Sequence, residues 1–272
     1  MNRPEQPSHL FPIADVQSAS DDRELAIDQV GIKGLRYPVL FADGDAVAQP
    51  TIAVCNVYVR LPEDRKGTHM SRLVALLESR SAPGEPPLTV ANLRSLLEAL
   101  VVLLEAPGGR MELAFPFFIR KSAPVSGVAS LLDYEARLVG ELDGGEYRQT
   151  VIVAAPVTSL CPCSKEISEY GAHNQRSLIT ITARENEPVT LTELIRIAEE
   201  EASCELYGIL KRADEKYVTE RAYNNPRFVE DLVRGVAARL DADDRIAAFA
   251  VEAENYESIH NHSVYAYQQE ER

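Results

Sequence analysis

The stretch LTVANLRSLLEALVVLLEAPGGRMELAFPFFIRK, residues 88–121, decides the fold class. Its first part, 88–106, predicts a helix, because leucines recur on one face at helical spacing, at Leu93, Leu96, Leu97, Leu100, Leu103 and Leu104. The breaker PGG at 107–109 ends this helix. Residues 110–121 follow at once, and their aromatic and aliphatic side chains predict a strand. A helix that passes directly into a strand indicates an α+β protein.

The segments around this stretch complete a unit of four strands and two helices. Upstream, we expect two strands and a helix at 31–43, 50–61 and 69–81. Downstream, an expected strand at 129–142 leads into the turn sequence DGGE at 143–146. The same order then repeats, with strands expected at 146–159, 176–185, 244–258 and 262–269 and helices at 190–210 and 226–242. Thr190 followed by Glu193 predicts a capping box at the third helix, and Pro226 is expected in the first turn of the fourth.

This element order, ββααββ twice, predicts tandem modules with antiparallel sheets and a helix pair on one face of each. We expect a flexible N-terminal tail at 1–25, a first module at 26–143 and a second module at 144–272 that holds most of the candidate metal-site residues. Several expected strands lack a polar outer face, and open sheet edges invite pairing with other chains. We therefore hypothesise that the chain closes its edges by forming an oligomer.

The composition is that of a globular protein with one large or two modest domains: 272 residues, 45% hydrophobic and 26% charged. The net charge of −14 argues against general nucleic-acid binding, which needs a basic surface. A local cluster of Lys and Arg could still hold one anionic small molecule. No apolar run is long enough to cross a membrane, and the N-terminus lacks the apolar core of a signal peptide. The sequence thus predicts a cytoplasmic protein, with no nucleic-acid or membrane partner and with reduced thiols.

Two of the four cysteines lie in the stretch richest in chemistry, LCPCSKEISEYGAHNQRS at 160–177. One proline separates Cys161 from Cys163, which strains a disulfide between them, and a thioredoxin-type redox pair needs two intervening residues. A structural zinc site needs a second Cys or His pair, and none follows at finger or ribbon spacing. The other two, Cys55 in an expected strand and Cys204 in an expected helix, are interpreted as small buried hydrophobes.

Side chains that can bind a divalent metal are spread over the second half of the chain. Cys161 and His173 lie across one loop, and His260 and His262 are expected on one face of a strand. The polar connection between the last two expected helices offers three carboxylates, Glu215, Glu220 and Glu230. A thiolate, an imidazole and a carboxylate together suit a catalytic metal site completed by water. The alternative is that these are ordinary polar groups of the surface.

Four separate motifs resemble the GTP cyclohydrolase type IB family. They are KGTHMSR at 66–72, PVTSLCPCSKEISEYGAHNQRS at 156–177, DEKYVTERAYNNPRFVEDLVR at 214–234 and ESIHNHSVYAY at 257–267. The similarity runs from about residue 25 to the C-terminus. It implies a tunnelling fold (T-fold) of two tandem modules and a homotetramer. It also implies the conversion of GTP and water to 7,8-dihydroneopterin 3′-triphosphate and formate, the first step of tetrahydrofolate synthesis, with a divalent metal such as manganese, zinc or iron.

The same resemblance implies roles for single residues. Cys161 and His173 match catalytic residues that also bind the metal, and Glu215 and His260 match its other ligands. Glu230 matches the carboxylate that anchors guanine. A carboxylate can accept both N1–H and the exocyclic N2–H of guanine, a pairing that adenine cannot offer.

The triphosphate needs cations, and the resemblance implies Lys66, His69 and Arg72 in KGTHMSR. Arg176 and Lys165, which flank the metal-binding segment, are further candidates. Cys163 could be a second thiol near the metal or a packed structural residue. We favour the packed residue, because two ligands so close in sequence strain the loop.

Three other functions are kept as alternatives. An archaeal-type relative would stop at a cyclic phosphate product, which product analysis would distinguish. A purine- or pterin-binding module without turnover would need the carboxylate at Glu230 and the phosphate cations but no thiolate. A structural metalloprotein would unfold when its metal is removed and would not bind GTP.

Overall fold

The computed structural model describes residues 15–271, and its central feature is one continuous antiparallel sheet. Within these residues the sheet has nine strands in the spatial order β1-β2-β3-β4-β5-β6-β8-β9, with β7 paired to β5. They are β1 (Ile27–Phe41), β2 (Gln49–Leu61), β3 (Gly108–Ser122), β4 (Ala129–Asp143), β5 (Glu146–Leu160), β6 (Asn174–Glu185), β7 (Cys204–Glu205), β8 (Ile246–Asn255) and β9 (Val264–Glu271). The eight long strands confirm the predicted strand order and the antiparallel α+β class.

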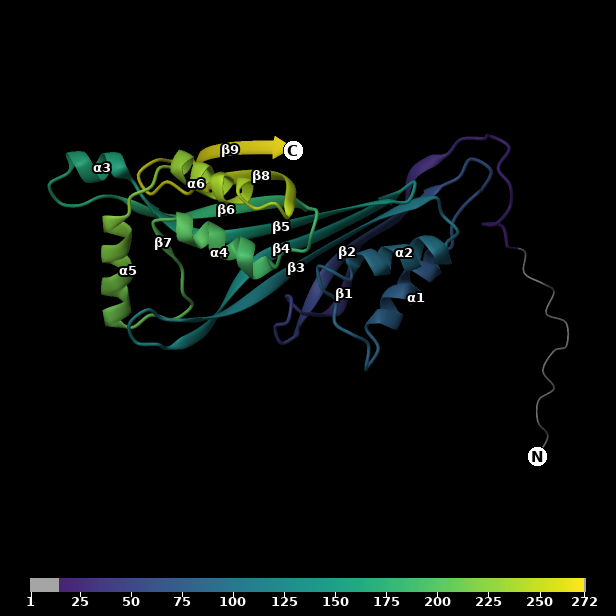
Figure 1. Ribbon diagram of the computed structural model, residues 1–272, viewed down its shortest axis with the longest axis horizontal. Helices are drawn as coiled ribbons and strands as arrows, with labels where there is room; N and C mark the ends of the chain where they lie inside the picture. The colour runs from purple at the N-terminus through teal and green to yellow at the C-terminus, as the bar shows by residue number, and fades with distance from the viewer. Residues whose placement is uncertain (1–14, 272) are drawn as a thin grey trace, which may run out of the picture.

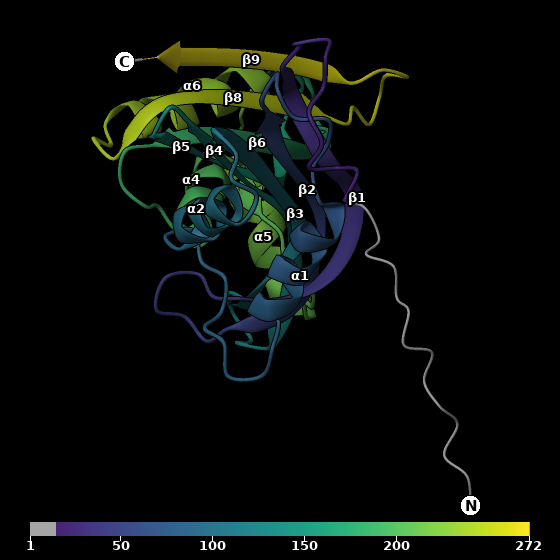
Figure 2. The same ribbon diagram turned by 90° about the vertical axis from the view of Figure 1, so that its right-hand side faces the viewer.

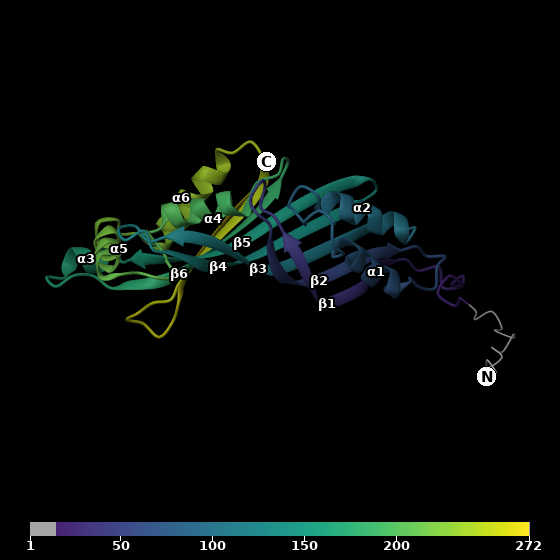
Figure 3. The same cartoon turned by 90° about the horizontal axis from the view of Figure 1, so that it is seen from below.

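The helices lie on one side of this sheet. They are α1 (Met70–Arg80), α2 (Leu93–Leu103), α3 (Pro162–Ile167), α4 (Leu191–Glu201), α5 (Arg212–Asn224) and α6 (Val229–Asp241). Figure 1 shows an elongated molecule with α3 and α5 at one end and α1 and α2 towards the other. Figure 2 shows the sheet curving around the helices, and Figure 3 shows α2, α4 and α6 above the strands. No helix in residues 15–271 is long and apolar enough to cross a membrane.

The turn DGGE joins the two ββααββ units. Asp143 pairs with Glu146 across the β4–β5 hairpin, which leaves a two-residue loop. Both loop residues, Gly144 and Gly145, have positive φ, at 57° and 88°. This backbone matches the type I′ turn that suits the twist of antiparallel strands, and glycine adopts it without steric cost. The sheet therefore runs from one unit into the next without interruption.

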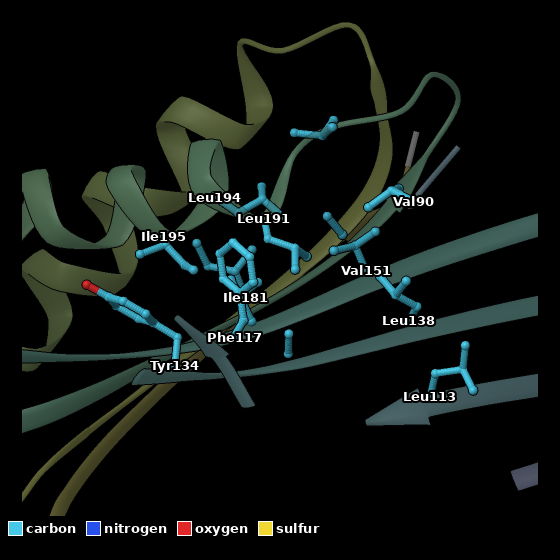
Figure 4. Packing of buried hydrophobic residues seen from close by; sticks show 14 of the residues in the cluster. Val90, Leu113, Phe117, Tyr134, Leu138, Val151, Ile181, Leu191, Leu194 and Ile195 are labelled. Carbon is cyan, nitrogen blue, oxygen red and sulfur yellow. The ribbon is translucent and has the colours of Figure 1, made fainter. Parts of the chain in front are cut away.

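One continuous hydrophobic core contains buried side chains of both units. Figure 4 shows Phe117 of β3 and Tyr134 of β4 beside Ile181 of β6, with Leu194 and Ile195 of α4 above them. All five belong to a single cluster of buried side chains. Removal of this apolar surface from water is the main force that holds α4 on the sheet. The division into modules at 143/144 stays a prediction.

Polar contacts at two side chains, Asp43 and Glu199, tie the first unit to α4 of the second. The buried Asp43 accepts a hydrogen bond of 2.8 Å from the backbone N–H of Leu191, at the start of α4. The ammonium group of Lys121 lies 2.6 Å from Glu199, and each of these side chains is only 9% exposed. The hydroxyl of Tyr134 donates a further hydrogen bond of 2.6 Å to Glu199. The buried charges are therefore paired, as burial requires.

The prediction of a helix at 190–210 is wrong for the residues after Glu201. Helix α4 ends earlier, and Cys204, expected on the helix, pairs with Thr158 of β5 as part of β7. The backbone N–H of Ser203 donates to Thr158 as well, at 3.1 Å. Strand pairing with β5 thus overrides a helical pattern that continues in the sequence.

Of the two predicted helix starts, one is confirmed and the other is wrong. The capping box is confirmed, because Glu193 N–H donates to the Thr190 hydroxyl at 3.2 Å and Thr190 N–H donates to the Glu193 carboxylate at 2.9 Å. Pro226 was expected in the first turn of the last helix, and this is wrong. Helix α6 begins at Val229, and Phe228 is its N-cap.

Two stretches expected to be irregular or extended have another structure. Helix α5 occupies what was expected to be a polar connection. Its buried residues are Asp214 and Ala222, so it lacks the apolar stripe by which a sequence pattern indicates a helix. His260 and His262 were expected on one strand face but lie in the loop before β9, with their rings stacked at 5.1 Å.

Most of the expected N-terminal tail, residues 1–14, lies outside the described residues. Residues 15–25 lie alongside the segment that precedes α1 and are hydrogen-bonded to it. The backbone N–H of Lys66 donates to Ala19 at 3.0 Å, and that of Gly67 donates to Gln17 at 3.1 Å. Ser20 forms an isolated bridge with Arg65. The flexible tail stays a prediction.

Candidate functional site

The loop from Cys161 to His173 is held closed by Ser164. The N–H of Cys161 donates to the carbonyl of His173 at 3.1 Å, where β5 ends and β6 begins. The Ser164 hydroxyl donates to the Cys161 carbonyl at 3.1 Å and accepts from the His173 N–H at 3.2 Å. Pro162 occupies the first turn of α3, where a missing N–H costs nothing. The predicted catalytic pair, Cys161 and His173, is therefore brought together by the backbone.

The thiol of Cys161 is the N-cap of α3. Its sulfur accepts a hydrogen bond of 3.5 Å from the Ser164 N–H, and the residue is half-buried. A sulfur in this position faces backbone donors while its other side remains accessible. The geometry suits a ligand or a nucleophile better than a packed hydrophobe.

His173 is held through one of its two ring nitrogens. Nδ1 lies 2.8 Å from Oε1 of Gln175 and 3.8 Å from Oε2 of Glu257. The side chains of His173 and Glu257 are 14% and 9% exposed. Glu257 reaches this position because the N–H of Tyr256 donates to the Arg176 carbonyl at 3.0 Å, which extends the β6–β8 pairing.

Gln175 and Glu257 were not singled out as site residues from the sequence. Both lie within motifs that resemble the family, but a Gln in a strand and a Glu in a loop gave no chemical signal. The contact between them and His173 depends on the pairing of β6 with β8, which the sequence alone does not show.

The other two predicted metal ligands stand apart from this pair. Glu215 lies exposed in the first turn of α5, and His260 lies exposed in the loop before β9. Within residues 15–271, no three His, Cys, Asp or Glu side chains are grouped so that they could hold a metal ion. The backbone pairing joins Cys161 and His173, whose side chains carry a thiol sulfur and an imidazole nitrogen, donor types that zinc and similar divalent metals prefer.

Glu230, the predicted guanine anchor, is exposed in the first turn of α6. Its neighbour Asp231 caps the helix, because its carboxylate accepts a hydrogen bond of 2.9 Å from the N–H of Phe228. Among the described residues, no hydrogen bond or ion pair engages the Glu230 side chain. Its carboxylate is thus free for a ligand.

The predicted triphosphate cations lie at the other end of the molecule. Lys66, His69 and Arg72 surround the start of α1, far from α3 in Figure 1. A cavity of about 180 Å³ opens there, lined by Arg60, Arg65, Gly67, Thr68, His69 and Arg72 among others. His69 contacts Ser18 and Asp15, both at 3.3 Å. One chain therefore does not bring these cations to Cys161.

Arg176 and Lys165 lie nearer to the pair. Arg176 is exposed, and the alternation of side chains along β6 places it on the face of the sheet opposite to the buried Gln175. Lys165 donates to the Tyr223 carbonyl at 2.6 Å and lies 4.5 Å from the centre of the Tyr223 ring. Lys165 therefore links α3 to the end of α5.

Arg227 is a cation that sequence reasoning missed. Its backbone N–H donates to the carbonyl of Leu160 at 3.0 Å, next to Cys161. Its side-chain Nε is buried and has no hydrogen-bond partner in residues 15–271. The surrounding NNPRF gave no sign of this, because the contact is made across the fold.

The four cysteines are free thiols, and their surroundings differ. Cys163 is exposed, so the expectation that it is a packed structural residue is wrong. It occupies the first turn of the short helix α3, which has no buried residue. Cys55 and Cys204 are buried as expected, and burial raises the pKa of both thiols, that of Cys55 to about 11. A raised pKa keeps a thiol protonated and unreactive.

Comparison with known proteins decides the family. The family described as "Type I GTP cyclohydrolase folE2" matches residues 13–266, starting before residue 25, where the resemblance was expected to begin. The chain belongs to the FolE2 family of type I GTP cyclohydrolases. Its FolE2 relatives include "GTP cyclohydrolase FolE2 1" of Burkholderia cenocepacia (strain HI2424), which is 58% identical over 261 residues, 96% of each chain. Another is "GTP cyclohydrolase FolE2" of Nitrosomonas eutropha (strain DSM 101675 / C91 / Nm57), 58% identical over 256 residues, 94% of each chain.

Solved structures show the fold that this FolE2 chain shares with other proteins. A uricase from Bacillus fastidious matches with a TM-score of 0.54 at 10% identity, covering 90% of this chain and 93% of that one. Uricase from Arthrobacter globiformis matches with a TM-score of 0.51, also at 10% identity and with the same coverage. The likeness confirms the tandem T-fold and, at this identity, nothing about the reaction.

Proposed function

We propose that this FolE2 chain converts GTP and water to 7,8-dihydroneopterin 3′-triphosphate and formate, the first step of tetrahydrofolate synthesis. Family membership supports the reaction. The observation in the structure that supports it best is the loop that holds Cys161 and His173 together through Ser164, with one ring nitrogen of His173 engaged and the other free.

We propose that Cys161 and His173 hold a divalent metal with Glu215 and His260. The thiol and imidazole fit manganese, iron or zinc in donor type, and zinc best, because sulfur is a soft ligand. A divalent metal bound there would supply Lewis-acid activation of the water that attacks C8 of guanine. His173 would offer Nε2 to the metal, since its contacts are made through Nδ1.

Glu230 is proposed to bind the base. Its free carboxylate at the start of α6 can accept N1–H and N2–H of guanine together, a geometry that places C8 at the opposite side of the purine. A pocket built for these two donors rejects adenine, because the carboxylate would be left buried without a partner.

The triphosphate cations Lys66, His69 and Arg72 are proposed to come from another copy of the chain in a homotetramer. Within one chain they lie at the far end from α3. The strands β1 and β9 are open edges of the sheet, and apolar side chains such as Ile52 and Leu131 are 60% and 52% exposed. Such edges and side chains favour association between chains.

The free thiols of all four cysteines support the proposed cytoplasmic location.

The decisive experiment is to incubate the metal-loaded protein with GTP and to measure formate and, after oxidation, fluorescent neopterin. A cyclic phosphate product or GTP binding without turnover would contradict the proposed reaction. The shared site has its own test, in which Cys161→Ala and Lys66→Ala are mixed under conditions that exchange subunits and are assayed at a GTP concentration too low for either variant alone to turn over. Partial recovery of activity is expected, because some mixed sites combine two intact halves. No recovery in confirmed mixed oligomers would place both residues in one subunit's site.

A further inference from the structure

A row of buried polar side chains leads away from His173 into the sheet. Gln175 Nε2 donates to the hydroxyl of Ser159 at 3.1 Å. The hydroxyls of Ser159 and Ser177 lie 2.8 Å apart, and Ser177 donates to Oδ1 of Asn255 at 2.7 Å. Ser159, Ser177, Asn255 and Gln175 are 0%, 1%, 4% and 7% exposed. The three adjacent strands β5, β6 and β8 thus share one hydrogen-bonded chain on their buried face.

The direction of this chain follows from proton counting. A serine hydroxyl has one proton to donate. Oδ1 of Asn255 accepts the proton of Ser177, and with the amide in this orientation Ser159 donates to Ser177. Ser159 then accepts from the amide nitrogen of Gln175, which turns Oε1 of Gln175 towards His173. An amide oxygen only accepts, so this orientation of the amides places the proton on Nδ1 of His173.

A second group favours the same tautomer. The carboxylate of Glu257 lies 3.8 Å from Nδ1, and an ionised carboxylate also only accepts. Two acceptors therefore face Nδ1. In a neutral ring with its proton on Nδ1, Nε2 keeps the lone pair that binds a metal or takes up a proton.

We propose that Gln175 is a positioning residue, which, oriented by Ser159, Ser177 and Asn255, fixes His173 as the Nδ1–H tautomer and keeps Nε2 free. The inference on the tautomer stands on the geometry of the chain itself. Its consequence for metal binding rests on the proposed function, in which His173 is a ligand. Histidine ligands commonly need such a partner on the second ring nitrogen, and its loss costs roughly 10- to 100-fold in metal affinity.

The sheet offers a matched control in Gln149. This glutamine is 6% exposed, lies on β5 and donates from Nε2 to the carbonyl of Val90 at 2.9 Å. It belongs to no part of the site. Gln175→Met and Gln149→Met each remove a buried, hydrogen-bonded amide and keep side-chain volume. Gln149 also bonds Tyr147 and Glu185, so its replacement should cost the fold at least as much as that of Gln175. Gln175→Glu keeps an acceptor for Nδ1 and is the conservative replacement.

The first measurement is the tautomer of His173 in metal-free protein. With only five histidines in the chain, histidine-selective ¹⁵N labelling gives a simple spectrum, assigned with a His173→Asn variant. At alkaline pH, wild type and Gln149→Met should show the Nδ1–H form. Gln175→Met should gain the Nε2–H form, and Gln175→Glu should retain Nδ1–H. An Nε2–H ring in wild type would overturn the proposal.

The second measurement is the dissociation constant for Zn²⁺, by competition with a chelator. We expect it to rise roughly 10- to 100-fold in Gln175→Met and less than about twofold in Gln149→Met. Equal losses in both variants, or none in either, would show a merely structural amide and overturn the proposal. The tautomer does not depend on turnover. A wild-type protein that shows Nδ1–H but releases no formate from GTP would refute the proposed reaction and leave the tautomer in place.

Discussion

Glu230→Gln is the sharpest test of base recognition, because the adjacent Asp231 provides an isosteric control. Both carboxylates lie in the first turn of α6, where each interacts favourably with the helix dipole, worth about 0.3–1 kcal/mol. Only Asp231 also caps the helix, through the N–H of Phe228. Asp231→Asn therefore reproduces every helix-related effect of Glu230→Gln and adds the weakened cap.

The magnitude follows from the contact that Glu230→Gln would lose. A hydrogen bond to a charged group contributes about 1.5–3 kcal/mol, and the new amide donor would oppose a guanine N–H. At about 1.4 kcal/mol per factor of ten, kcat/KM for GTP should fall roughly 10- to 150-fold. The melting temperature should fall only slightly in both variants, by roughly 1–4 °C for about 1 kcal/mol.

The assay is formate release from GTP, with melting and bound metal measured on the same samples. We expect Asp231→Asn to retain kcat/KM within about twofold and to melt at or below the temperature of Glu230→Gln, because it also weakens the cap. If both variants convert GTP like wild type, the reasoning fails. Glu230 is then only a helix-start carboxylate, and the guanine anchor must be sought at Glu220 or elsewhere.

Three further predictions concern the metal, the phosphates and the core. Cys161→Ala should abolish formate release and sharply lower bound metal, and full activity with metal in excess would contradict the assignment. Lys66→Ala or Arg72→Ala should weaken GTP binding far more than guanosine binding. Rising salt should also weaken the binding of GTP to wild type. Equal losses of GTP and guanosine binding in these variants would mean that the two cations do not face the triphosphate. Lys121→Met should cost about 3–5 kcal/mol in urea unfolding, because it leaves the buried charge of Glu199 without a cation. Adding Glu199→Met should recover most of the loss, and a cost of Lys121→Met under about 1 kcal/mol would contradict this.

Local signals in the sequence predicted those elements that depend on neighbouring residues. The leucine repeat of 88–106 predicted α2, and Asp143-Gly144-Gly145-Glu146 predicted the turn that joins the units. The capping box of Thr190 and Glu193 predicted the start of α4. In each case the interacting groups lie within one turn or one face of a single element, so the spacing of residue types is sufficient.

Two missed elements, β7 and α5, depend on contacts between segments far apart in the chain. Strand β7 forms because the segment after α4 pairs with β5. The hydroxyl of Thr158 in β5 donates to the carbonyl of Cys204, and these two residues are 46 positions apart in the sequence. Helix α5 has no apolar stripe, and the buried Asp214 ties its start to the β3–β4 connection through the N–H groups of Val125 and Ser126, each at 2.8 Å. Such contacts leave no periodic trace in the sequence.

For the site, the motifs around Cys161 and His173 were sufficient to name the pair and the family. The sequence could not show that Gln175 and Glu257 face the same ring nitrogen, or that the cations of KGTHMSR lie at the other end of the chain. Alternation along a strand tells which side chains share a face, but only the pairing of β5, β6 and β8 decides which of them meet. Residue type thus determines the chemistry that is possible, and strand register determines which groups are close enough to perform it.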